Sequence, residues 1–228
     1  MKRAVMLQVR LASRRLPDKA LLNLSGEPVV AHCLHALRAV QASEYLLLTD
    51  RHSAAKLEPH ARRYGFSVWV GSEHDVLDRY VSAVDAYNVD TVVRATGDNP
   101  LVSAWLANEL LSRHEREEAD YSGFLGMPLG TGVECIRADA LRTAHAEARL
   151  RYDREHVAPY LYSHPERFRI HRPAVSDDLA CETRVTLDTE DDFRFLSRIF
   201  DELWHGTPIE IHALVSRLRK PDLVRKTA

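Results

Sequence analysis

The first half of the chain alternates short apolar runs with longer segments whose apolar residues recur every three or four positions. A short apolar run bounded by turn residues is typical of a buried strand, and the longer spacing is typical of a helix with one buried face. We predict strands at residues 4–9, 45–48, 66–70 and 91–95. We predict helices at residues 28–40, 52–64, 76–87 and 105–114.

This alternation predicts the fold class, an α/β protein with a mainly parallel sheet flanked by helices. Right-handed crossovers bring the carboxyl ends of parallel strands to one edge of the sheet. Ligands of open α/β sheets bind at that edge. The loops at residues 10–19, 71–75 and 97–101 each follow a predicted strand, so we expect them to meet there.

The second half of the chain is less regular, and we interpret residues 1–228 as one domain with a smaller lobe at about 123–180. Residues 123–132 are rich in Gly and Pro and predict a loop or a hairpin. The basic tail from Arg217 is expected to fray. Further helices are predicted at 139–149, 154–162 and 191–203, and further strands at 168–173 and 184–187.

The composition is that of an ordinary globular protein with little net charge. Of the 228 residues, 45% are hydrophobic, and the formal net charge is −2. This balance does not favour binding to nucleic acid or to membrane surfaces. No apolar stretch has the length of a membrane span or of a signal-peptide core, so we expect a cytoplasmic protein. The three cysteines are far apart in sequence, which indicates free thiols.

A basic loop at residues 8–19 follows the first predicted strand directly. Arg10, Arg14, Arg15 and Lys19 place four cations within ten residues. Cations and loop N–H groups can together hold a triphosphate, which carries about four negative charges. The loop matches neither the P-loop nor the dinucleotide-binding pattern. The alternative interpretation is a solvated basic loop.

Two carboxylates stand where predicted strands end. Asp98 follows Gly97 directly after one strand, and Asp188 ends the strand predicted at 184–187. Mg²⁺ prefers oxygen ligands and usually takes only one or two protein carboxylates. The alternatives are a simple turn at Gly97–Pro100 and a capping turn in which Thr189 begins a helix.

A fourth segment, residues 152–160, combines charged and aromatic side chains. Arg154 and His156 could hold an anionic acceptor, with Tyr152 and Glu155 ordering them. A lone histidine would more often be structural, so this segment carries less weight than the other three.

Taken in order, five segments resemble the cytidylyltransferase superfamily that activates sugar acids. The nearest resemblance is to its spore-coat polysaccharide biosynthesis branch, which is related to 3-deoxy-manno-octulosonate and acylneuraminate cytidylyltransferases. The matching segments are QVRLASRRLPDK at 8–19, GSEHDVLDRY at 71–80, RATGDNPL at 94–101, YDREHVAPY at 152–160 and TLDTEDD at 186–192. Together they are specific, whereas no single segment would be.

The resemblance implies a nucleotide-binding fold of the glycosyltransferase-A type, a homodimer and a Mg²⁺ cofactor. It implies transfer of CMP from CTP to a sugar acid or a related anionic acceptor, with release of pyrophosphate. By position, it implies catalytic roles for Arg10, Lys19 and Asp98, and metal binding by Asp98 and Asp188. It places Gln8, Arg10, Ser13, Arg15, Lys19, Gly71, Ser72 and Thr96 against the nucleotide, and Tyr152, Glu155 and His156 on the acceptor side.

Three residues depart from the family pattern. Asp18 replaces the usual Gly before the lysine, Arg14 replaces the usual Thr, and Gly132 stands where many relatives have an acidic residue. The last departure leaves open a non-sugar phosphate acceptor, and another nucleoside triphosphate is also possible.

A non-catalytic nucleotide-binding protein is a further alternative, although it would not need the paired carboxylates Asp98 and Asp188. A glycosyltransferase is another possibility, but residues 188–190 only approximate the D-x-D motif of that class.

Overall fold

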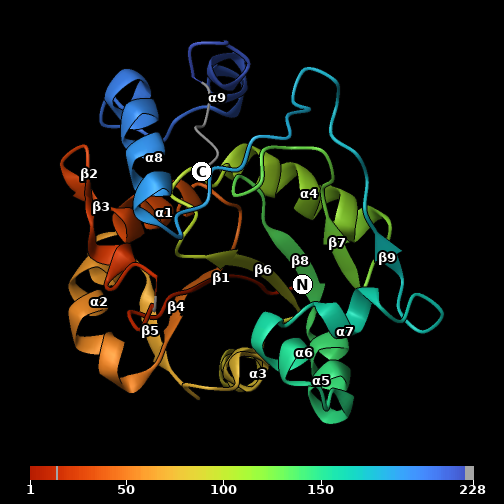
Figure 1. Ribbon diagram of the computed structural model, residues 1–228. Coiled ribbons are helices and arrows are strands. Elements are labelled where there is room, and N and C mark those ends of the chain that lie inside the picture. Colours follow the sequence, from red (N-terminus) through yellow and green to blue (C-terminus); the bar gives the residue numbers. More distant parts are fainter. Residues whose placement is uncertain (14, 224–228) are drawn as a thin grey trace.

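The protein folds around a seven-stranded, mostly parallel sheet with helices on both faces (Figure 1). The computed structural model describes residues 1–13 and 15–223. The strand order is β5-β4-β1-β6-β8-β7-β9, and the first four strands in that order run parallel. They are β1 (Arg3–Gln8), β4 (Glu44–Thr49), β5 (Ser67–Val70) and β6 (Thr91–Thr96). These are the four strands predicted for the first half, and they are confirmed.

The four predicted helices, each of which follows one of these strands, are also confirmed: α1 (Val29–Leu37), α2 (Arg51–Arg63), α3 (Val76–Tyr87) and α4 (Ala104–Arg116). Alternate residues of β1 enter opposite cores. Val5 and Leu7 pack with α1 and α4, whereas Ala4 and Met6 pack with α3. Burial on both faces explains why the strands are continuous apolar runs.

The sheet continues with three short strands from the second half of the chain. β8 (Glu134–Arg137) pairs antiparallel with β6, β7 (Tyr121–Gly123) pairs antiparallel with β8, and β9 (Ile170–His171) extends the edge. The helices α5 (Ala138–Glu147), α6 (Arg151–His156) and α7 (Pro159–Tyr162) lie on the same face of the sheet as α3 (Figure 1). The interpretation of residues 123–180 as a smaller lobe stays a prediction.

Two secondary-structure predictions in the second half are wrong. Residues 184–187 form no strand, only an isolated bridge between Leu129 and Arg184. The helix predicted at 154–162 is broken at Val157, whose φ of 72° is incompatible with a helix. Pro159 then begins α7, at a position where its missing N–H costs nothing.

Three small elements near the N-terminus have no counterpart in the predictions. They are the 3-10 helix η1 (Lys19–Leu21) and a hairpin of β2 (Asn23–Leu24) and β3 (Glu27–Pro28).

The C-terminal part of the chain packs on the face of the sheet that α1 covers. The helix α8 (Glu190–Leu203) begins with a reciprocal cap between Thr189 and Asp192, as the sequence indicated for Thr189. The helix α9 (Ile211–Leu218) holds Arg217, whose guanidinium is buried against Glu202 and Asp222. The prediction that the chain frays from Arg217 is therefore wrong for residues 217–223, because ion pairs anchor Arg217. Residues 224–228 lie outside the described part.

Within the described residues, no helix is both long and apolar enough to cross a membrane. The three cysteines are free, with Cys33 and Cys135 buried.

The buried imidazole of His114 on α4 should make stability depend on pH. Burial and the charge of Arg137 lower its pKa from 6.5 to about 4. Because the unfolded chain takes up the proton first, stability is present above pH 6.5 and is lost as the pH falls toward 4. By pH 4.5 this one group should remove about 2–3 kcal/mol from the free energy of unfolding.

Urea unfolding from pH 7 to 4.5 checks this. His114→Gln should show a shallower loss of stability than the parent protein. His52→Gln, at a side chain that is 83% exposed, should keep the parent slope. An equally steep loss in His114→Gln would contradict the prediction.

Candidate functional site

A cleft of about 960 Å³ opens at the carboxyl ends of β1 and β6, the edge where the sequence placed the ligand site. Most of the predicted site residues line it together: Gln8, Arg10, Ser13, Arg15, Lys19, Thr96, Asp98, Glu155, His156 and Asp188. Three predicted residues, Gly71, Ser72 and Tyr152, are not part of this lining.

The basic loop forms one wall of the cleft. Its backbone closes on itself through a bond from the Asp18 N–H to the Leu11 carbonyl of 3.3 Å. Asp18 adopts the left-handed φ of 50°, a conformation that glycine adopts at less cost than other residues. Its carboxylate turns to Lys56 on α2, at 3.3 Å, rather than to Lys19. The acid inside the loop therefore does not compete for the charge of Lys19. Arg14 lies outside the described residues.

Lys19 joins the two predicted metal carboxylates at the foot of the cleft. Its ammonium lies 3.1 Å from Asp98 Oδ2 and 2.9 Å from Asp188 Oδ1, and it donates to the Leu187 carbonyl at 2.6 Å. Its side chain is only 14% exposed. The two carboxylates therefore converge on a single point, although they come from opposite halves of the chain.

Asp188 forms more ion pairs than Asp98 does. Arg15 lies 3.3 Å from it, and Arg184 forms a further ion pair. Burial works to raise the pKa of Asp188, but the hydrogen bond and charge of Lys19, with Arg184 and Arg15, outweigh burial and lower it. The carboxylate is therefore ionised at neutral pH.

Backbone contacts fix both acids. The Gly97 N–H donates to the Gln8 carbonyl at 2.9 Å, and a Cβ at Gly97 would lie 2.5 Å from Val9 Cγ2. Only glycine lets the two strand ends approach this closely. The Leu187 N–H donates to the Asp98 carbonyl at 2.8 Å. This bond places Asp188 beside Asp98 without a paired strand.

The donor set of the site suits a hard divalent cation. Two carboxylates face one cationic position, and phosphates or water complete the shell of Mg²⁺ in such sites. Across the described residues, no group of three His, Cys, Asp or Glu side chains could enclose a metal. The residues therefore fit a cation shared with a ligand rather than a closed protein cage.

The opposite wall comes from α6. Glu155 forms an ion pair with Arg10 at 3.1 Å, which connects this wall to the basic loop. His156 also lines the cleft. Tyr152 is 60% exposed and packs on the His156 ring, with 4.4 Å between ring centroids. Tyr152 therefore supports His156 from outside the cleft.

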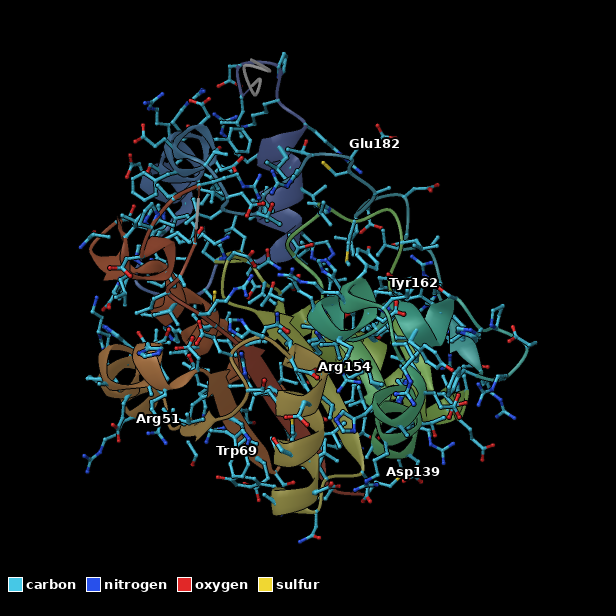
Figure 2. All side chains as sticks on the ribbon, turned by 60° about the horizontal axis from the view of Figure 1, so that its bottom comes forward. Arg51, Trp69, Asp139, Arg154, Tyr162 and Glu182 are labelled. Atoms are coloured by element: carbon cyan, nitrogen blue, oxygen red, sulfur yellow. The ribbon has the colours of Figure 1, made fainter. Side chains whose placement is uncertain are left out.

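Arg154 does not face the acceptor side as the sequence suggested. Its guanidinium forms an ion pair with Asp75 before α3 and donates to the carbonyls of His145 and Ala148, at 3.0 and 3.2 Å. Figure 2 shows Arg154 beside α3. The residue fixes α6 in place, so its role is to position its neighbours.

Gly71 and Ser72 lie behind the cleft wall. The Ser72 carbonyl accepts from Arg79 Nε at 2.8 Å, and a Cβ at Gly71 would lie 2.7 Å from Arg79 Cγ. Arg79 is 1% exposed, and burial lowers its pKa. The next two residues, Glu73 and His74, reach the lining.

Several lining residues escaped the sequence predictions: Glu73, His74, Arg79, Arg94 and Arg151. Arg94 is half-buried and paired with Glu134 of β8, which also accepts from the Tyr121 hydroxyl at 2.7 Å. Its place in the segment 94–101 was a usable signal. Arg151 had none, because a single exposed arginine at a helix start is unremarkable in sequence.

Comparison with known proteins identifies the family of the chain. A model of the cytidylyltransferase family matches residues 4–204. The spore coat polysaccharide biosynthesis protein SpsF of Bacillus subtilis is 29% identical over 227 residues, covering 95% of this chain and 94% of that protein.

Solved structures share the fold. A cytidylyltransferase from Leptospira borgpetersenii superposes with a TM-score of 0.90 at 25% identity, covering 100% of this chain and 98% of that one. A CMP-2-keto-3-deoxy-manno-octonic acid synthetase solved with CTP gives 0.69 at 16% identity, covering 89% and 99%. The nucleotidyltransferase fold expected from the sequence is therefore confirmed. Since the family model covers most of its length, the chain belongs to the cytidylyltransferase family.

Proposed function

We propose that this protein transfers CMP from CTP to a small anionic acceptor, a sugar acid or a related compound, and releases pyrophosphate. The observation that carries the proposal is the convergence of Asp98 and Asp188 on Lys19 beneath the basic loop. The relation to a synthetase solved with CTP supports the choice of nucleotide.

In this reaction an acceptor oxygen attacks the α-phosphorus while the bond to the leaving pyrophosphate breaks. The protein acts by positioning the reactants and stabilising charge. Arg10, Arg15 and Lys19 would bind the phosphates and neutralise the leaving group, and Gln8, Ser13 and Thr96 would complete the nucleotide site. Mg²⁺ held by Asp98 and Asp188 would supply further neutralisation of phosphate charge.

The wall formed by α6 would hold the acceptor, and residues 123–180 would form the acceptor side. Glu155 and His156 line this wall, with Tyr152 behind them. Arg151 lines this wall too. Unlike the other described arginines and the lysine of the cleft, its side chain forms no ion pair and no hydrogen bond to a backbone carbonyl. Its charge therefore suits a carboxylate or phosphate of the acceptor.

Gly132 bears on the identity of the acceptor. A Cβ there would lie 1.9 Å from Met127 Cε, so an acidic side chain at this position would have to displace the methionine. Without a carboxylate at Gly132, the acceptor side would carry one negative charge fewer, which suits an anionic ligand. The homodimer stays a prediction from the resemblance.

Pyrophosphate release tests the activity. With Mg²⁺ and a panel of sugar acids and phosphorylated acceptors, we expect turnover with CTP to exceed that with ATP, GTP or UTP. Turnover with a different nucleotide would change the substrate. Binding of nucleotide without turnover on any acceptor would favour the non-catalytic alternative.

Removing the charge of Asp98 should abolish most of this activity. Asp98→Asn keeps the side-chain shape, so we expect kcat/KM to fall by about 10²–10³, as for other lost electrostatic contacts. Asp85→Asn is a matched control on the surface, where Asp85 pairs with Arg142. Full activity in Asp98→Asn would refute the metal assignment.

Loss of the Arg151 charge should weaken binding of the acceptor and leave binding of CTP unchanged. We expect Arg151→Gln to raise the KM for the acceptor by roughly tenfold or more, the range of one charged hydrogen bond, with the KM for CTP unchanged. Arg149→Gln, two residues away and outside the cleft lining, should change neither constant. A larger effect on CTP than on the acceptor would place Arg151 in the nucleotide site instead.

A further inference from the structure

The ammonium of Lys19 has no hydrogen left to donate. An ammonium has only three N–H donors. In this structure it has three oxygen partners, Asp98 Oδ2 at 3.1 Å, Asp188 Oδ1 at 2.9 Å and the Leu187 carbonyl at 2.6 Å. A phosphate can therefore reach Lys19 only if the lysine gives up at least one of these oxygens.

The other two described cations of the basic loop are also paired. Arg10 binds Glu155 at 3.1 Å, and Arg15 lies 3.3 Å from Asp188. The loop that would bind the triphosphate is therefore neutralised by carboxylates of the same cleft. The two carboxylates that would bind a metal ion are, in turn, neutralised by Lys19.

We propose that Lys19 holds the place of the divalent cation, and that the ligand this site accepts is the complex of a divalent cation with a triphosphate. The triphosphate part rests on the proposed function. A free cation would have to displace an ammonium bonded to both Asp98 and Asp188. A free triphosphate that drew Lys19 away would leave these two carboxylates facing each other without a counter-ion.

The complex avoids both costs. Its cation replaces the ammonium between the carboxylates while its phosphate oxygens replace the carboxylates around Lys19. Each charged group then exchanges one partner for another of the same sign, and no buried charge is left alone. The cation and the nucleotide thus enter together, because either one alone opposes an existing ion pair.

Binding of Mn²⁺ to the nucleotide-free protein, measured by the loss of its free electron paramagnetic resonance signal, tests the place-holding role. We expect the parent protein to bind Mn²⁺ weakly and Lys19→Met to bind it at least about tenfold more tightly, since a charged hydrogen-bonding competitor is gone. Lys19→Arg keeps a cation and should bind Mn²⁺ as weakly as the parent. Lys56→Met removes another lysine paired with an aspartate, Asp18, and should also leave the affinity unchanged.

Equal Mn²⁺ affinity in Lys19→Met and the parent would overturn the proposal. An equal gain in Lys56→Met would overturn it too, since net charge would then be the cause. The double variant Lys19→Met with Asp188→Asn should lose the gain in Mn²⁺ affinity, which would place the bound ion at Asp188. These measurements need no nucleotide, so they stand even where the pyrophosphate assay fails.

Thermal unfolding of the unchanged protein gives a readout that does not depend on any variant folding. CTP with a chelator, or Mn²⁺ alone, should shift Tm little, and the two together should raise it. A rise with Mn²⁺ alone as large as the rise with both would contradict the proposal.

Discussion

One ammonium group ties together the three segments that make the cleft. Lys19 binds Asp98, 79 residues away, and Asp188, 169 residues away. Lys19 follows β1, and Asp98 follows β6. Asp188 lies on a segment that forms no strand. Because two acids this close repel each other, the charge of Lys19 between them offsets their repulsion. The approach of the two carboxylates in this structure therefore depends on that ammonium.

The first half of the fold could be predicted because its strands are buried on both faces. Such strands are continuous apolar runs, and helices of ordinary spacing separate them. The strands β7 and β8 escaped prediction because they are short and include Tyr121, Ser122 and Glu134. Residues 184–187 have strand-like composition, but Val185 bonds to the Leu129 carbonyl and Leu187 to the Asp98 carbonyl, and neither partner belongs to a strand. Whether a segment pairs with a neighbouring strand depends on the tertiary structure, and composition alone does not predict it.

The approach of Lys19 to Asp98 was predictable from the rule that strand ends meet at one edge. Asp188 reaches them by a different route, because it ends no strand and is held there by the bond from Leu187 to the Asp98 carbonyl. The role of Arg154 was not, because its partner Asp75 lies 79 residues away in a loop. Arg217 shows the same limit, since a basic tail and an anchored helix have similar sequences. Charged side chains near a cleft can bind a ligand or brace the wall, and only the position of their partners separates the two roles.

The glycines near the site are held by different constraints. The wall formed by the basic loop is fixed by its backbone: Gly97 packs against Val9 with no room for a side chain, and Asp18 adopts a left-handed turn. Such positions tolerate little change. Around Gly132, by contrast, the space beside the backbone is filled by the side chain of Met127. A flexible side chain can give way where backbone and a β-branched neighbour cannot, so substitution is better tolerated at Gly132 than at Gly97.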